Sequence, residues 1–167
     1  MLRIAVPVLA MVLALCLIPS AFAAAAAEGR MLGLLNADRA RNGLGPLTPD
    51  PALAAVARAH SQDMVSHGFF SHNSPSTGDP EARLNRSGIA WRAYAENVSY
   101  NSSVEESEAS LMRSPGHRAN ILNPSYDTVG IGIVQGARSL FVTQVFIKAG
   151  GGRSRAARTR RFHVPGF

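Results

Sequence analysis

The distribution of hydrophobic and polar residues changes character after residue 122. Before it, apolar residues recur among charged ones, and helices are predicted at about residues 29–41, 48–67, 79–86, 103–113 and 114–122. After it, residues 128–134 and 140–147 are runs of β-branched and aromatic side chains joined by the turn-forming segment QGARS. Residues 89–98 are a candidate third strand. Helices followed by a small antiparallel sheet predict an α+β fold in which the helices cover the sheet.

Several helix ends carry capping signals. Thr48 is the predicted N-cap of the second helix, with Pro49 at the first helical position, and Gly68 is predicted to end that helix. An Asp-Pro pair at residues 79–80 begins the third helix, and the sequence SVEE at residues 103–106 has the form of a capping box.

The first 23 residues are predicted to be a cleaved export signal. Arg3 gives the segment a positive start, residues 4–18 form an apolar run, and Ala-Phe-Ala at residues 21–23 has the small-x-small form of a cleavage site. The run is shorter than the roughly 20 residues of a membrane span, so cleavage is favoured over a retained anchor, and no transmembrane span is expected afterwards. Because Cys16 is the single cysteine, the mature protein is expected to lack disulfides and a thiol nucleophile. The predicted location is outside a bacterial cell or in its envelope, the periplasm included.

The excess of positive charge belongs to the end of the chain. Residues 24–147 contain 10 basic and 11 acidic residues, whereas residues 148–167 contain six basic residues and no acidic one. The sequence therefore predicts one near-neutral domain at residues 24–149, followed by a basic, disordered tail at residues 150–167. The tail is expected either to be a solvated end or to attach the protein to anionic envelope polymers or lipid headgroups. Export makes a specific nucleic-acid partner unexpected.

Residues able to carry acid–base or metal chemistry lie in three stretches of the domain. The candidates are His60, Asp63, His67, His72, Glu96 and His117. The first three share one face of a predicted helix, where a hydrogen-bonded structural cluster is more usual than a metal site. His72 directly follows Phe69, Phe70 and Ser71. Burial of both rings, at roughly 1.5–3 kcal/mol each, would hold His72 at the mouth of a cleft, and a loop histidine with satisfied hydrogen bonds is an equal alternative.

Glu96 and His117 are less conspicuous in the sequence. Glu96 lies among apolar, strand-like residues, and a half-buried carboxylate needs a partner, for which Arg118, His72 or a metal ion are candidates. His117 lies near the start of a short predicted helix, where a solvated first-turn residue is the default interpretation. The serines that follow Glu96 lack a nucleophile-elbow pattern, which argues against a serine hydrolase.

Seven segments taken together resemble the CAP superfamily of cysteine-rich secretory, antigen 5 and pathogenesis-related proteins, and in particular its bacterial SCP-like extracellular branch. The segments are LNADR at residues 35–39, HSQDM at 60–64, FFSHNSP at 69–75, AEN at 95–97, SPGHRANIL at 114–122, VGIG at 129–132 and VTQV at 142–145. Each motif is weak alone, but seven in the family's order are specific, and they cover about residues 30–147. The resemblance implies an α-β-α sandwich, which agrees with the α+β fold predicted from the hydrophobic pattern.

The resemblance also implies a central cleft in which two histidines and two acids can hold a divalent cation, often zinc. By motif position it assigns His72 as the first histidine and Glu96 as the first acid. Phe141 replaces the second histidine of the eukaryotic members, and Ser114 stands near the position of their second acid. The SPGHR motif of the bacterial branch points instead to His117. The predicted metal- and ligand-binding set is therefore His72, Glu96 and His117.

The predicted function is a secreted binding module whose cleft holds a divalent cation or a small or lipidic envelope ligand. The alternative is a metal-dependent, peptidase-like hydrolase, in which the cation lowers the pKa of a bound water and Glu96 or a histidine moves protons. Glu96 cannot readily be both a ligand and a free base, and CAP domains share no established common reaction. Binding is therefore favoured, and no catalytic residue is assigned. A third interpretation is a purely structural envelope domain in which the three site residues form a hydrogen-bonded cluster.

Overall fold

A computed structural model describes the backbone of residues 6–150 and the side chains from residue 22 onward. Its elements are α1 (Val6–Arg41), β1 (Thr48–Pro49), α2 (Pro51–His67), α3 (Pro80–Ser87), β2 (Trp91–Asn101), α4 (Val104–Arg113), α5 (Pro115–Ile121), β3 (Thr128–Gln135) and β4 (Leu140–Ala149). The predicted basic tail lies outside the described residues from residue 151 onward. At the other end, α1 runs through the predicted cleavage point, and cleavage itself stays a prediction. Within the described part of the chain, no helix is both long enough and apolar enough to span a membrane.

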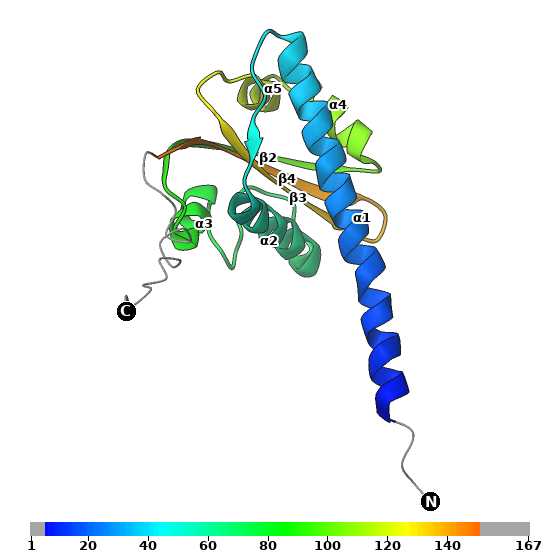
Figure 1. The fold of residues 1–167 in the computed structure, drawn as a ribbon. Coiled ribbons are helices and arrows are strands. Elements are labelled where there is room, and N and C mark those ends of the chain that lie inside the picture. The colour runs from blue at the N-terminus through cyan, green and yellow to red at the C-terminus, as the bar shows by residue number, and fades with distance from the viewer. Residues whose placement is uncertain (1–5, 151–167) are drawn as a thin grey trace, which may run out of the picture.

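The four strands form one sheet in the order β1-β3-β4-β2, with helices on both faces (Figure 1). β3 and β4 form the predicted hairpin, and the third predicted strand, β2, pairs antiparallel with β4 at the edge of the sheet. β1 pairs parallel with β3 through Thr48–Thr128 and Pro49–Val129. The sheet is therefore mixed, whereas the hydrophobic pattern predicts a purely antiparallel one.

Each face of the sheet has its own hydrophobic core. The core on the side of α1, α4 and α5 includes Met31, Leu35, Leu111, Ile121, Val129, Ile131, Val142 and Phe146. The core on the side of α2 and α3 consists of Leu53, Ala57, Leu84, Val145 and Ile147. This arrangement is the α-β-α sandwich expected from the resemblance.

α2 lies directly on the backbone of β3. A Cβ atom added to Gly132 would be 2.0 Å from the main-chain nitrogen of Arg58, and one added to Gly130 would be 2.3 Å from the carbonyl carbon of Leu53. Atoms cannot approach this closely, so only glycine at both positions allows the helix and strand to pack at this distance. The close contact fixes α2, and with it the side chains that α2 contributes to the candidate site.

The start of α2 differs from the prediction. Asp50, not Thr48, is the N-cap, because its Oδ1 accepts a hydrogen bond from the main-chain nitrogen of Leu53 at 2.8 Å. Pro51 then occupies the first turn, where its missing N–H costs nothing. Thr48 and Pro49 are extended and form β1. The predicted end is confirmed: Gly68 has a left-handed φ of 67° and its N–H bonds the Met64 oxygen.

The end of α1 is tied to the end of α5 by a buried arginine. Arg39 donates from Nη1 to the main-chain oxygens of Ile121 at 2.8 Å and Asn123 at 3.0 Å, and from Nε to the oxygen of Gly45 at 2.9 Å. Burial lowers the pKa of this guanidinium, and the three carbonyl acceptors offset the cost of placing it there.

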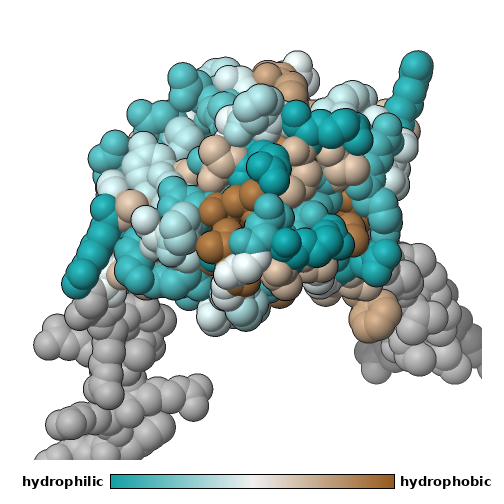
Figure 2. All heavy atoms as spheres, turned by 90° about the horizontal axis from the view of Figure 1, so that it is seen from above, coloured by the Kyte–Doolittle hydropathy of each residue, from teal (hydrophilic) through white to brown (hydrophobic). Residues whose placement is uncertain are grey.

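Seen from the side of α5 and the end of α1, hydrophilic residues enclose small hydrophobic patches (Figure 2).

Candidate functional site

His72 lies on the loop after α2, and the two phenylalanines before it have different surroundings. Phe69 is half-buried, with its ring centroid 6.1 Å from that of His60. Phe70 is 52% exposed, and its ring lies 6.2 Å from that of Tyr100 on β2. The expectation that both rings are core residues is therefore wrong for Phe70. One ring is enough to anchor the loop because hydrogen bonds hold its other end.

Asp63 of α2 provides those hydrogen bonds. Its carboxylate accepts from the hydroxyls of Ser74 and Ser76, the latter at 2.9 Å to Oδ1, and lies 2.7 Å from Nδ1 of His67. Burial alone would raise the pKa of Asp63, but the bonds from Ser74, Ser76 and His67 bring it below its ordinary value. Asp63 therefore holds the loop that carries His72, whereas His67 bonds to Asp63 from the same helix. Both residues have structural roles, which is the interpretation favoured from the sequence.

Glu96 joins His72 to a buried arginine that no motif in the sequence indicates. Oε1 of Glu96 lies 3.0 Å from Nδ1 of His72, and Oε2 accepts from Nη2 of Arg83 at 2.7 Å. The carboxylate is 2% exposed, the guanidinium 5%, and the imidazole 45%. Arg83 also donates from Nη1 to the main-chain oxygens of His72 at 3.0 Å and Gly78 at 2.6 Å. Arg83 thus holds both the carboxylate and the loop, and His72 extends from them toward solvent.

His60 is buried next to His72 and Glu96. Its ring is buried, Nε2 lies 3.0 Å from the main-chain oxygen of Ser71, and the same nitrogen is 3.8 Å from Oε1 of Glu96. A carbonyl oxygen only accepts, so Nε2 carries the hydrogen. Burial lowers the pKa of His60, and Glu96 opposes the effect without reversing it. His60 is a neutral structural residue, as expected, but it touches the site.

His117 approaches the same place from α5. Its ring centroid lies 6.4 Å from that of His72, with 50° between the ring planes, and the ring is half-buried. Burial lowers the pKa of His117, and the nearby His72 lowers it further. The main-chain oxygen of His117 accepts from Nδ2 of Asn97 at 3.2 Å. The structure therefore brings together the three predicted residues, His72, Glu96 and His117, at the β2 edge of the sheet.

The fit of this cluster to a cation can be tested on its geometry. Two imidazoles that share a tetrahedral zinc, with bonds of about 2.0–2.1 Å, have ring centroids about 5 Å apart. The rings of His72 and His117 lie 6.4 Å apart, so they would have to approach by about 1 Å. Both oxygens of Glu96 already have partners. Among the described residues, no three histidine, cysteine or acidic side chains are assembled for metal binding. The two histidines and the occupied carboxylate therefore suit an open site with two histidine ligands better than a closed site with three ligands.

Phe141 stands where the resemblance places a histidine in eukaryotic members. It lies opposite Tyr100 in the β2–β4 register, and the two ring centroids are 4.7 Å apart. Tyr100 is 47% exposed and also contacts Phe70. We call Phe70, Tyr100 and Phe141 the aromatic row. It begins two residues before His72, continues with Tyr100 on β2, the strand that carries Glu96, and ends with Phe141 on the neighbouring strand β4.

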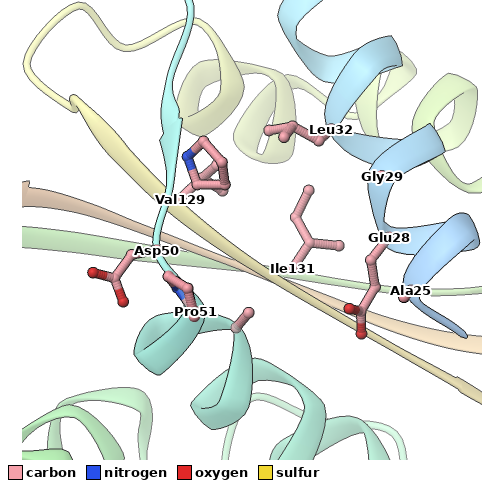
Figure 3. Close-up of a pocket in the computed structure, with 10 residues that line it drawn as sticks. Ala25, Glu28, Gly29, Leu32, Asp50, Pro51, Val129 and Ile131 are labelled. Carbon is pink, nitrogen blue, oxygen red and sulfur yellow. The ribbon is translucent and has the colours of Figure 1, made fainter. Parts of the chain in front are cut away.

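An apolar pocket of about 220 Å³ lies at the opposite edge of the sheet, between α1, the start of α2 and β3. The side chains of Leu32 and Ile131 line its middle, and Glu28 and Asp50 lie at its margins (Figure 3). Glu28 is bonded to Arg58 at 2.6 and 2.8 Å, and Asp50 caps α2. This pocket contains none of the predicted site residues.

Two curated bacterial proteins resemble the chain. It is 39% identical over 109 residues to the uncharacterized protein YkwD of Bacillus subtilis, covering 65% of this chain and 42% of YkwD. It is 34% identical over 124 residues to the uncharacterized membrane protein YlbC of the same organism, covering 72% of this chain and 34% of YlbC. The chain therefore spans less than half the length of either relative.

The structural and family comparisons agree with these likenesses. The fold resembles the crystal structure of an extracellular SCP-domain protein from Bacillus anthracis, with a TM-score of 0.69 and 32% identity over 74% of this chain and 40% of that one. The model of the cysteine-rich secretory protein family, CAP, matches residues 32–146. The match includes His72, Glu96 and His117, and it covers most of the described domain. The chain belongs to the CAP family.

Proposed function

We propose that this protein is an exported binding module whose ligand centre is the pair of imidazoles of His72 and His117, which would hold a divalent cation such as zinc weakly. One observation carries the proposal. Glu96 accepts from Nδ1 of His72 at 3.0 Å while Arg83 holds the other carboxylate oxygen at 2.7 Å.

This contact decides which nitrogen of His72 is available. An ionised carboxylate only accepts hydrogen bonds, so Nδ1 carries the hydrogen and Nε2 keeps its lone pair. A carboxylate behind a histidine in this way fixes the tautomer and ring orientation of metal-binding histidines generally. The lowered pKa of His117 keeps the second imidazole neutral at pH 7, as a ligand must be.

Glu96 is in this account an orienting group. For Glu96 to bind the cation directly, its carboxylate would have to give up its bond to either His72 or Arg83.

The same contacts bear on the hydrolase alternative. A general base needs a carboxylate that is free to take a proton, and both oxygens of Glu96 are engaged. Binding is therefore the function that the contacts favour.

The aromatic row supports a ligand with an apolar part. Phe70 and Tyr100 are about half exposed and touch each other beside the loop of His72. Exposed apolar side chains that cluster mark interaction sites more often than scattered ones do. A small or lipidic envelope ligand could place an oxygen at the histidine pair and its apolar part against the row. The basic segment after residue 150 would attach the protein to anionic envelope polymers, a proposal that rests on the sequence alone.

Calorimetric titration of the untagged mature protein with zinc tests the proposal. His72→Ala and His117→Ala should each abolish the binding isotherm, and Glu96→Gln should weaken binding because the amide no longer fixes the tautomer. His67→Ala is the matched control, because His67 is an exposed histidine bonded to Asp63 outside the site. Binding should weaken as the pH falls, since protons compete for the neutral imidazoles. Equal zinc uptake by wild type and the His72→Ala/His117→Ala double variant would contradict the proposal.

A further inference from the structure

A buried carboxylic acid lies on the face of the sheet opposite Glu96, and the proposed binding chemistry does not use it. Glu108 of α4 is 3% exposed, and its Oε2 accepts a hydrogen bond from Nε2 of Gln144 at 2.8 Å. Its other oxygen, Oε1, has no hydrogen-bond partner among the described residues. The ionised form is poorly solvated there, and the protonated form has a donor hydrogen with no acceptor. Each protonation state therefore leaves one polar requirement unmet.

A chain of side-chain amides leads from this acid to α5. Oε1 of Gln144 accepts from Nδ2 of Asn97 at 3.0 Å, and Nδ2 of Asn97 also donates to the main-chain oxygen of His117 at 3.2 Å. Oδ1 of Asn97 accepts from Nδ2 of Asn120 at 2.9 Å. Both amide hydrogens of Asn97 are thus committed, one toward Gln144 and one toward α5. Because both bonds use the same nitrogen, a change in the strength of one alters the strength of the other.

We propose that Glu108 is a positioning residue for the His72–His117 site, because its protonation state is carried through Gln144 and Asn97 to the main chain of His117. The inference rests on the proposed function, because Glu108 can affect binding only if His72 and His117 form the binding site. An ionised Glu108 makes a charge-assisted bond to the amide of Gln144, which polarises that amide and strengthens its bond to Asn97. The carbonyl of Asn97 in turn accepts more strongly from Asn120, so α5 is held more firmly and His117 is better ordered for binding when Glu108 is ionised.

The acid titrates in the range where this matters. Burial raises the pKa of Glu108 to about 7; the bond from Gln144 opposes the rise, and the negative charge of Asp38 on α1 adds to it. Asp38 is itself paired with Arg41. β4 presents to Glu108 the neutral amide of Gln144, which is bonded in turn to the neutral amide of Asn97 on β2.

Other charged groups on the elements around α4 have partners of their own. Arg30 of α1 pairs with the exposed Glu105 on α4 at 2.8 Å. Arg118 of α5 donates to Oδ1 of Asn42 at 3.2 Å. α4 is joined to α5 directly through Ser114, and the amide chain is the side-chain route from Glu108 to the main chain of His117.

The first test needs no metal and is made by NMR on the mature protein between about pH 5.5 and about pH 8.5. The carboxyl carbon of Glu108, the side-chain amides of Gln144 and Asn97, and the carbonyl carbon of His117 should share one midpoint near pH 7. Glu108→Gln keeps the shape and the acceptor for Gln144 but cannot ionise, so the shared inflection should vanish in it. The proposal would be overturned if the chemical shifts of His117 and Asn97 did not change at the midpoint of Glu108, or if they changed equally in Glu108→Gln.

Two further measurements separate this inference from the proposed function. The ratio of the zinc affinity of wild type to that of Glu108→Gln should rise about threefold or more from pH 6.5 to pH 8. This change corresponds to less free energy than one typical hydrogen bond contributes. A ratio that does not change with pH would overturn the positioning role. Gln144→Met interrupts the amide chain, so Glu108 should still titrate while the carbonyl of His117 no longer follows it. If the shared midpoint is present but zinc does not bind, the positioning of α5 stands and the proposed function fails.

Discussion

The replacement Glu108→Gln should change the pH dependence of stability in a direction that the structure determines. A glutamate in the unfolded chain ionises near its ordinary pKa of 4.5, whereas burial raises the pKa of folded Glu108 to about 7. Between these two values the native state binds more protons than the unfolded state, so the free energy of unfolding falls as the pH rises from about 4.5 to about 7. Above the folded pKa the decline stops, because both states are then ionised.

The size of the effect follows from the displacement of the pKa. At 1.36 kcal/mol for each pH unit, a rise from 4.5 to about 7 corresponds to roughly 3 kcal/mol of stability lost by pH 8. Glutamine avoids this loss but leaves its own amide hydrogens at the unpartnered Oε1 position, at about 1 kcal/mol. Glu108→Gln should therefore be about 2 kcal/mol more stable than wild type at pH 8, and level with it or about 1 kcal/mol less stable at pH 5.

Urea unfolding of both proteins at pH 5 and pH 8, followed by the fluorescence of the single tryptophan, Trp91, measures this difference. Every other titrating group is common to the two proteins, so the comparison isolates Glu108. A stability difference that is the same at both pH values would refute the reasoning, because it would mean that Glu108 is ionised, or protonated, throughout.

Three other predictions concern stability. Arg83→Met should cost about 3–5 kcal/mol, because it leaves the buried carboxylate of Glu96 without its guanidinium; adding Glu96→Gln should recover part of the loss, and a double variant no more stable than the single one would contradict this. Gly132→Ala should destabilise by about 3 kcal/mol or more in denaturant unfolding, because its Cβ would lie 2.0 Å from a backbone atom of α2. The control Gly33→Ala, in an exposed helical position with open space, should instead stabilise by about 0.5–1 kcal/mol, and similar effects at the two glycines would show that α2 can move. Arg39→Met should lower the midpoint of thermal unfolding by several degrees, since three carbonyl groups lose their donor; an unchanged midpoint would show that water replaces the guanidinium.

Local signals in the sequence predict most of the fold. The β3–β4 hairpin depends on neighbouring residues, and so do the helices capped by Asp79 and Ser103, whose hydroxyl accepts from the main-chain nitrogen of Glu106 at 3.1 Å. The two-residue strand β1 cannot be predicted in this way, because its pairing with β3 joins segments about 80 residues apart. Once Thr48 and Pro49 are extended in that strand, the helix has to begin after Asp50.

The site shows the same division between motif and packing. The motifs indicate His72, Glu96 and His117, and the structure brings them together, but their roles as ligands stay predictions. Arg83 has no local signal, because its contacts with Glu96 and the loop exist only after α3 packs against β2. The exposure of Phe70 also depends on tertiary packing, since its neighbour Phe69 takes the space beside His60.

The central claim is that Nε2 of His72 and the imidazole of His117 form the binding pair. Long-range ¹H–¹⁵N NMR spectra of the mature protein, recorded at about pH 7.5 while zinc is added, test this most directly. Before zinc, His72 should be the Nδ1–H tautomer, as its contact with Glu96 requires. On addition, Nε2 of His72 and one nitrogen of His117 should shift together, while both nitrogens of His67 stay unchanged. A His72 that carries its hydrogen on Nε2, or zinc-induced shifts confined to His67, would contradict the account.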